Sequence, residues 1–340
     1  MRELTIERND AGQRLDKFLT KAVKSLPMSL MYKSIRTKKI KVNRKRSDPS
    51  YILSEGDTLQ LFISEEFFSD ETSSDSFMKL RPSLDIVYED ENILLCNKPA
   101  GMVVHEDESG DESNTLISHI KAYLYRKGEY DPEKEQSFTP ALCNRIDRNT
   151  AGIVIAVKNA EALRIMNEKV RNREIKKYYL CVCHGIFEKK ADRLTGYMRK
   201  DSIEKRVYVC NSGHPGRDVK TMITDYRVIA ESGDLSLLCV ELITGRTHQI
   251  RAHMKHIGHP LFSDERYGGN EILRGERCGS YQQFIRNCFK LCPRQALHAK
   301  TLGFVHPKTG KQMDFTSTLP DDMEQLLEKW RRRQSNDEEM

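Results

Sequence analysis

One carboxylate lies between two arginines in the segment CNRIDRNTAGIVIAVKN, residues 143–159. Asp147 is flanked by Arg145 and Arg148 and precedes an unbroken apolar run, residues 153–157. A charge at the end of a buried strand must be paired to be tolerated, and an ionised carboxylate held in this way can act as a nucleophile or a base. The same residues also suit an ion pair that only fixes a loop. This segment alone leaves both interpretations open.

A second segment, LITGRTHQIRAHMKHIGHPLFSDERYGG at residues 242–269, predicts a strand, a glycine turn and a helix. Thr247 occupies the expected N-cap position of this helix and Gly258 the expected C-terminal glycine position. The residues expected to point inward are Ile250, Met254 and Ile257.

Arg251 lies on another face of this expected helix, together with Thr247 and Lys255. We therefore expect Arg251 to reach the carboxylate of Asp147. The positive end of the helix dipole would help keep that carboxylate ionised, or would bind a phosphate.

The histidines and cysteines near this helix do not have the spacing of a metal site. The sequence therefore predicts no metal, and it predicts ordinary thiols rather than zinc ligands. The residues considered are His248, His253, His256, His259, Cys278, Cys288, Cys292 and His298.

The positive charge is concentrated at the start of the chain. Residues 1–64 hold 14 Lys and Arg against 7 Asp and Glu, whereas the remainder holds 42 against 43. Such a patch favours binding to a phosphate backbone, although a solvated basic face is the alternative. The residues expected to contact RNA here are Lys39, Lys41, Arg44, Lys45 and Arg46.

This N-terminal region reads as two short helices, a strand at IKVN with a basic turn, and a strand after the turn at residues 55–57. Over residues 12–64 it resembles the ribosomal-protein-type alpha-L RNA-binding motif, which implies a small α/β RNA-binding domain. We divide the chain into this domain (1–64), an acidic flexible linker (65–80), a catalytic domain (81–330) and a polar tail (331–340).

Residues beyond 84 predict an α+β fold with a large sheet. The expected strands are DIVYED, NILLCN, GIVIAV, YYLCVCHG, VKTMITDYRVIA and LSLLCVELITG, and the expected helices include RIMNEKVRN and DMEQLLEKWRRRQ.

The whole chain has nine cysteines without a CxxC pair, no apolar stretch of membrane-spanning length and no glycine-rich nucleotide loop. These features predict a cytoplasmic protein without disulfides, membrane contact or cofactor, and nothing demands more than a monomer.

Six segments together resemble the RluA family of RNA pseudouridine synthases over about residues 84–318. They are NKPAGMVVH, NRIDRNTAG, the KKYY tract, GRTHQIRAH, IGHPLFSDERYGG and QALHAKTLGFVHPKTG. The resemblance implies a mixed, mostly antiparallel sheet with a central RNA-binding cleft. It also implies cofactor-free isomerisation of uridines, with 23S ribosomal RNA or a precursor ribosomal particle as the expected partner.

The same resemblance assigns roles to individual residues. Asp147 would assist breakage of the bond between uracil and ribose, by attack on the sugar, by attack on the ring, or by removal of a ribose proton. Arg251 would pair with Asp147, while Tyr179 would stack on the uracil and help remove its carbon-five proton. Tyr178 is the alternative for an exposed tyrosine.

Four further residues are expected to contact RNA: Asn144, Arg145, Arg148 and Arg246. Arg145 would fill the gap left by a displaced base, or would contact a phosphate. The family has His where this chain has Asn144 and Ser where it has Ala151, so target preference is expected to differ. The open alternatives are a non-catalytic ribosome-assembly factor and a hydrolase that releases uracil.

Overall fold

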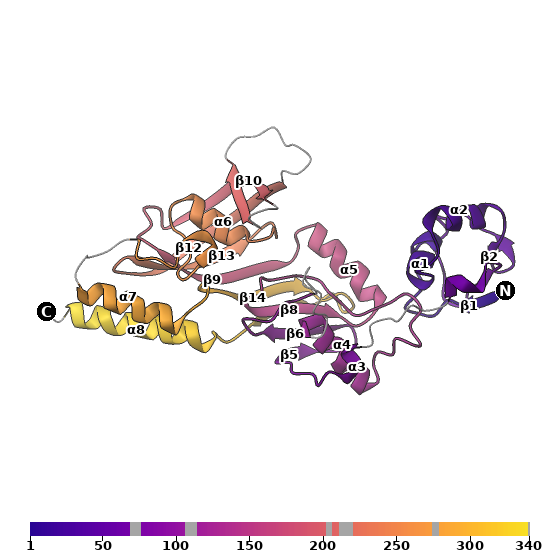
Figure 1. Cartoon of the computed structure of the whole chain (residues 1–340), viewed down its shortest axis with the longest axis horizontal. Coiled ribbons are helices and arrows are strands. Elements are labelled where there is room, and N and C mark those ends of the chain that lie inside the picture. Colours follow the sequence, from indigo (N-terminus) through magenta and orange to yellow (C-terminus); the bar gives the residue numbers. More distant parts are fainter. Residues whose placement is uncertain (69–75, 106–113, 202–205, 211–219, 274–278, 339–340) are drawn as a thin grey trace.

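The computed structural model describes the chain except for residues 69–75, 106–113, 202–205, 211–219, 274–278 and 339–340. Two sheets, each with its own buried core, organise the described residues. Figure 1 shows the small N-terminal sheet at one end of an elongated molecule and the large sheet along the rest of it. Among the described residues, no helix combines the length and apolar character needed to cross a membrane.

The N-terminal domain is a four-stranded sheet in the order β1-β4-β2-β3, covered by two helices. Leu15, Phe18 and Leu19 are fully buried on the inner side of α1, as their helical spacing predicts. Pro27 is the N-cap of α2, where its fixed φ begins a helix without losing a hydrogen bond. The elements are β1 (Arg2–Thr5), α1 (Leu15–Ala22), α2 (Met28–Arg36), β2 (Ile40–Val42), β3 (Lys45–Arg46) and β4 (Thr58–Leu61).

The large sheet has the strand order β11-β10-β12-β13-β9-β14-β8-β6-β5, with β15 paired to β14 and β7 to β8. Every pair is antiparallel except β14 with β8, so the sheet is mixed and mostly antiparallel, as expected. Its strands are β5 (Ile86–Glu89), β6 (Ile93–Lys98), β7 (Ala141–Leu142), β8 (Ala151–Val157), β9 (Lys176–His184), β10 (Ala191–Asp201), β11 (Arg206–Cys210), β12 (Lys220–Ser232), β13 (Leu235–Leu242), β14 (Leu297–Val305) and β15 (Gln312–Thr316).

Helices cover the sheet at several places, and α7 and α8 lie side by side near the C-terminus (Figure 1). Short 3-10 helices occur at η1 (Glu65–Phe68) and η3 (Glu265–Tyr267). The α-helices are α3 (Ser76–Lys79), α4 (Leu116–Lys127), α5 (Ala160–Arg171), α6 (Gln249–His256), α7 (Gly279–Leu291) and α8 (Asp321–Glu338).

Strand β8 is an interior strand of the large sheet, and all seven of its residues are buried. It pairs with β6 on one side and β14 on the other. Gly152 has φ +124°, and a Cβ atom there would lie 2.2 Å from the carbonyl oxygen of Ala299. Only glycine therefore permits this close approach of β8 and β14.

The two domains contact each other through the loop after β1. The hydroxyl of Ser137 donates to the carboxylate of Asp10 at 2.6 Å, and the Gln13 amide donates to the same hydroxyl at 2.7 Å. Arg164 on α5 donates to the Ala11 carbonyl at 2.7 Å. Asp10 is only 1% exposed, whereas Arg164 is exposed, so only the Asp10 part of this contact is closed to water.

Two of the boundary expectations differ from the structure. Residues 65–68 and 76–79 are helical, and Phe77 is buried in the core of the large domain, so the ends of the expected linker belong to the two domains. Its centre, residues 69–75, lies outside the described residues. The expected polar tail is also helical as far as Glu338, because α8 continues through it.

Candidate active site

Asp147 lies in the turn between β7 and β8, where the Thr150 amide donates to its carbonyl at 3.0 Å. The next two carbonyls are also held: Arg148 accepts from Gly101 N at 2.9 Å, and Asn149 accepts from Arg294 Nη1 at 2.9 Å. The side chain of Asp147 remains 23% exposed. The turn thus presents one carboxylate to solvent on a fixed backbone.

Arg251 reaches this carboxylate from α6. Its Nη1 lies 2.9 Å from Asp147 Oδ2, which is the contact that the sequence predicts. Its Nε and Nη2 bind both carboxylate oxygens of Asp264 at 2.7 and 2.8 Å. Burial lowers the pKa of Arg251, but the hydrogen bonds and charges of Asp264 and Asp147 outweigh it and raise the pKa. The guanidinium is therefore a permanent cation beside Asp147.

Lys98, at the end of β6, is a second basic group within electrostatic reach of Asp147. It is completely buried, and its ammonium donates to the carbonyls of Pro99, Met102 and Arg148 at 2.7, 2.7 and 3.0 Å. Burial lowers its pKa to about 7, while the charge of Asp147 acts in the opposite direction. Three acceptors match the three N–H donors of the charged form.

His248 faces Asp147 from the start of α6. Its Nε2 lies 3.9 Å from Asp147 Oδ2, and its Nδ1 lies 3.3 Å from the Tyr267 hydroxyl. That hydroxyl accepts the Val207 amide at 3.1 Å, which leaves its own proton for His248 Nδ1. Burial lowers the pKa of His248, so a neutral ring directs an Nε2–H toward the carboxylate.

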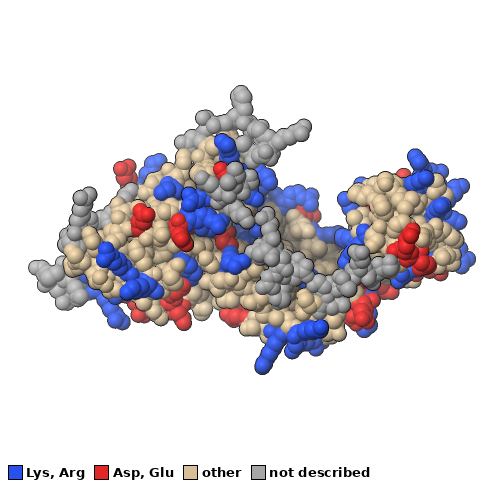
Figure 2. All heavy atoms as spheres, viewed as in Figure 1, with Lys and Arg blue, Asp and Glu red and all other residues tan. Residues whose placement is uncertain are grey.

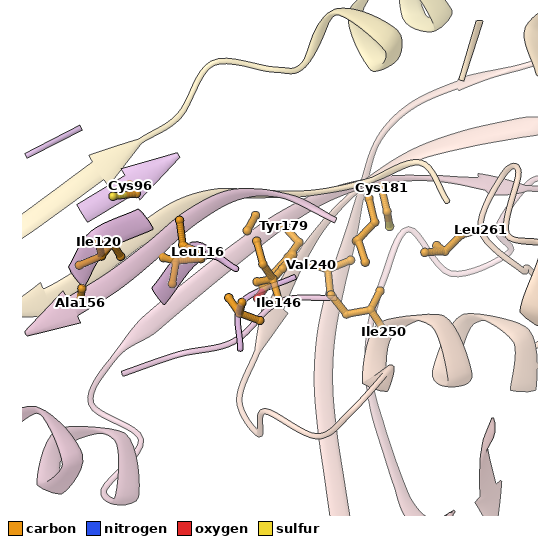
Figure 3. Packing of buried hydrophobic residues seen from close by; sticks show 14 of the residues in the cluster. Cys96, Leu116, Ile120, Ile146, Ala156, Tyr179, Cys181, Val240, Ile250 and Leu261 are labelled. Carbon is orange, nitrogen blue, oxygen red and sulfur yellow. The ribbon is translucent and has the colours of Figure 1, made fainter. Parts of the chain in front are cut away.

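Tyr179 lies on β9 within the same core as Ile146 and Val240, which surround it in Figure 3. It is 6% exposed. Burial raises its pKa and the negative charge of Asp147 raises it further, so the phenol is neutral near pH 7 and lies within electrostatic reach of Asp147. Tyr178, the alternative considered from the sequence, is the more exposed of the two tyrosines.

Of the four residues expected to contact RNA around the site, three are exposed and one is bonded to the backbone of β8. Arg145, Arg148 and Arg246 are exposed. The side chain of Asn144 instead accepts the Ile155 amide at 2.8 Å and donates to the Ile153 carbonyl at 3.3 Å. Its amide therefore fastens the turn to β8.

The basic residues of the N-terminal domain form a common surface on β2, β3 and their turn. Lys39, Arg44, Lys45 and Arg46 are exposed and Lys41 is half-buried. A groove of about 660 Å³ beside them runs between α2 and the segment after β3. Figure 2 shows Lys and Arg side chains around this domain. The residues that line the groove include Tyr32, Lys33, Arg36, Arg46 and Pro49.

The predicted N-cap of α6 is wrong. His248, with φ +52°, precedes the helix in place of Thr247. Buried Gln249 determines this start, because its side chain binds Arg246 N at 3.1 Å and Thr224 on β12 at 2.8 Å. Gly258, with φ +85°, follows the helix as expected.

Sequence reasoning missed Lys98, His248, Asp264 and Arg294 as groups around Asp147. Lys98 and Asp264 lie inside the family-like segments NKPAGMVVH and IGHPLFSDERYGG, so the available signal was their place in these segments. In the part of the chain that the structure describes, no group of His, Cys, Asp and Glu side chains is arranged to hold a metal ion.

Comparison with known sequences places this arrangement in a family. Residues 92–256 match the model of RNA pseudouridylate synthases, and residues 13–59 match the S4 domain. An uncharacterized RNA pseudouridine synthase of Chlorobaculum parvum is 32% identical over 96% of this chain and 97% of its own. The chain therefore belongs to the RNA pseudouridine synthase family, with an S4 domain at its N-terminus.

Particular relatives carry more specific names. The ribosomal large subunit pseudouridine synthase C of Escherichia coli K12 is 30% identical, with 96% of each chain aligned. A solved structure of human RNA pseudouridylate synthase domain containing 4 is similar in fold, with a TM-score of 0.54, 18% identity and coverage of 72% of this chain and 92% of the other. The fold, the enzyme class and the RNA-binding domain expected from the sequence are confirmed.

Proposed function

We propose that this enzyme converts specific uridines of large-subunit ribosomal RNA, free or in a precursor particle, to pseudouridine, with Asp147 as the catalytic residue. The observation that carries the proposal is the carboxylate of Asp147, partly exposed and 2.9 Å from a buried arginine, within the family region. The name of the Escherichia coli relative supports ribosomal RNA as the substrate.

The reaction is an isomerisation whose atoms balance without a cofactor. The bond from ribose carbon one to uracil nitrogen one breaks, the base turns over, and carbon one bonds to carbon five. The carbon-five proton leaves and nitrogen one gains a proton. Asp147 can serve by attack on carbon one, attack on carbon six of the ring, or removal of a ribose proton.

Arg251 supports Asp147 in each of these routes, because it places a cation beside the carboxylate, and Lys98 lies within electrostatic reach of it. An ionised carboxylate is the form that attacks or accepts a proton. His248 adds a neutral N–H donor on the same side.

Tyr179 would provide the surface against which the uracil packs. Its raised pKa keeps the phenol protonated, which favours stacking over removal of the carbon-five proton. The target base must leave its helix or loop to reach Tyr179, at a cost of about a few kcal/mol.

The basic surface of the N-terminal domain would bind the RNA backbone, and exposed Arg145, Arg148 and Arg246 would hold the RNA near Asp147. A single chain supplies all of these groups, so a monomer suffices. A ribosomal RNA substrate places the proposed reaction in the cytoplasm. The side chain of Asn144 would act by fixing the turn instead of contacting RNA.

The test compares the purified enzyme with Asp147→Asn on unmodified transcripts of ribosomal RNA and on precursor particles, followed by chemical mapping of pseudouridine. Sites formed by the wild type alone would support both the reaction and the role of Asp147. RNA binding by both proteins without any new pseudouridine would favour a ribosome-assembly factor. Free uracil among the products would identify a hydrolase.

A further inference from the structure

Arg251 divides its hydrogen-bond donors between two carboxylates. Nε and Nη2 form a two-pronged pair with Asp264, and Nη1 faces Asp147. Because the guanidinium is planar, the pair with Asp264 fixes its plane and therefore the direction of Nη1. The ring of Tyr267 lies 5.1 Å from the guanidinium carbon and adds a cation–π contact.

Asp264 itself is held in place on a constrained loop. Its side chain has no exposed surface, and its Oδ1 accepts the Tyr267 amide at 3.2 Å. Gly269 closes the loop by donating to the Asp264 carbonyl at 2.7 Å, and a Cβ atom at Gly269 would lie 1.8 Å from the Leu261 carbonyl oxygen. The carboxylate is thus a rigid support for Arg251.

We propose that Asp264 is a positioning residue of the active site: it aims the guanidinium of Arg251 at Asp147 and so sets the orientation of the Asp147 carboxylate. Asp264 acts on Asp147 through Arg251, and its other side-chain contact is the Tyr267 amide. Asp264 is also a counter-ion for the buried charge of Arg251. Without Asp264, that charge would be paired with Asp147 alone. This inference rests on the proposed role of Asp147.

Orientation matters here because a catalytic group displaced by about 1 Å loses on the order of 100-fold in rate. Asp264→Asn has the same shape but presents an N–H group to one of the two arginine donors, so one prong of the pair is broken. We expect kcat to fall by about 10- to 100-fold and the dissociation constant for RNA to stay within about twofold.

The experiment has two arms. The first records arginine side-chain N–H signals by NMR in the full-length protein without RNA. The Nε–H and Nη–H protons of Arg251 should exchange slowly in the wild type, and Asp264→Asn should abolish the protection of Nη1. Persistent Nη1 protection in the variant would overturn the proposal, whether or not the protein makes pseudouridine.

The second arm measures kcat from tritium released from RNA labelled at uridine carbon five, in a double-mutant cycle with Arg251→Gln. Asp264→Asn should lower kcat at least about tenfold in the wild type and less than about threefold in Arg251→Gln. Equal factors in both backgrounds would show that Asp264 acts independently of Arg251, and would overturn the proposal. An inactive wild type would contradict the proposed function alone, because the NMR arm does not use turnover.

Asp90→Asn is the matched control, because Asp90 is also a well-bonded carboxylate but lies in the turn between β5 and β6, at the far edge of the sheet. It should leave kcat unchanged. If Asp264→Asn fails to fold, Asp264→Glu replaces it: the charge stays, but the added methylene shifts the guanidinium. Wild-type kcat and Nη1 protection in Asp264→Glu would overturn the proposal.

Discussion

The ammonium nitrogen of Lys98 lies 3.0 Å from the carbonyl oxygen of Arg148, the residue that follows Asp147. The contact joins β6 to the turn that carries the carboxylate, and no water reaches it because Lys98 is fully buried. Lys98 therefore holds the backbone of the turn, within electrostatic reach of Asp147.

Replacing Lys98 with Met is expected to lower both stability and turnover. Three carbonyls lose the hydrogen bond from the buried ammonium, which costs on the order of 3 kcal/mol in the free energy of unfolding. The released turn should lower kcat at least about tenfold, because the direction of Asp147 is no longer fixed. Urea unfolding and tritium release measure the two effects.

Lys158→Met is the matched control for this prediction. Lys158 is also buried, but it binds Glu89 and the Asp90 carbonyl at the other end of β8. The control should lose stability and keep its kcat. Equal losses of kcat in the two variants would show that turnover only follows stability.

Buried histidines should make the protein sensitive to mild acid. Burial lowers the pKa of His253 and of His298 from 6.5 to about 4, and the native state keeps both rings neutral. Between pH 4 and 6.5 the unfolded chain binds more protons than the native state does. The free energy of unfolding should therefore fall as the pH drops from about 6.5 toward 4, by up to about 1.4 kcal/mol per pH unit for each histidine.

Urea unfolding at pH 7, 6 and 5 measures this slope. His253→Phe should flatten it by the contribution of one histidine. A slope in His253→Phe equal to that of the wild type would refute the assignment.

The sequence predicted the elements that rely on local patterning. The helical spacing of α6 put Arg251 on a face that reaches Asp147, and the apolar run at residues 153–157 marked the fully buried strand β8. Both depend on periodicity within one segment, which a sequence shows directly.

The parts that the sequence did not reveal depend on contacts between distant segments. Lys98 lies 50 positions from Arg148, and Asp264 reaches Arg251 only because the loop closed by Gly269 folds back on α6. The start of α6 differs from the predicted start for the same reason, because Gln249 binds the distant strand β12. A pattern within one segment carries no information on such long-range pairs.

Gly152 is expected to tolerate no side chain. Alanine would need φ +124° and would place its Cβ atom 2.2 Å from the Ala299 carbonyl oxygen, so β8 and β14 would have to separate. We expect Gly152→Ala to lose more than about 3 kcal/mol of stability by urea unfolding. Gly279→Ala, where the added atom meets open space, is the control and should unfold as the wild type does. A stable Gly152→Ala protein would mean that β8 and β14 can move apart at little cost.

The basic surface of the S4 domain should determine RNA affinity without changing the chemistry. Neutralising Lys39, Lys41, Arg44, Lys45 and Arg46 to Gln should weaken binding, because fewer RNA phosphates are then neutralised by the protein. The slope of log affinity against log salt should become shallower by up to about 0.7 to 0.9 for each phosphate contact that the variant loses. At saturating RNA, kcat should stay at the wild-type value, because none of these residues is near Asp147 in the fold. The control neutralises Lys308 and Lys311, in the loop between β14 and β15, and should leave the slope unchanged. An unchanged slope in the fivefold variant would show that RNA binds elsewhere on the enzyme.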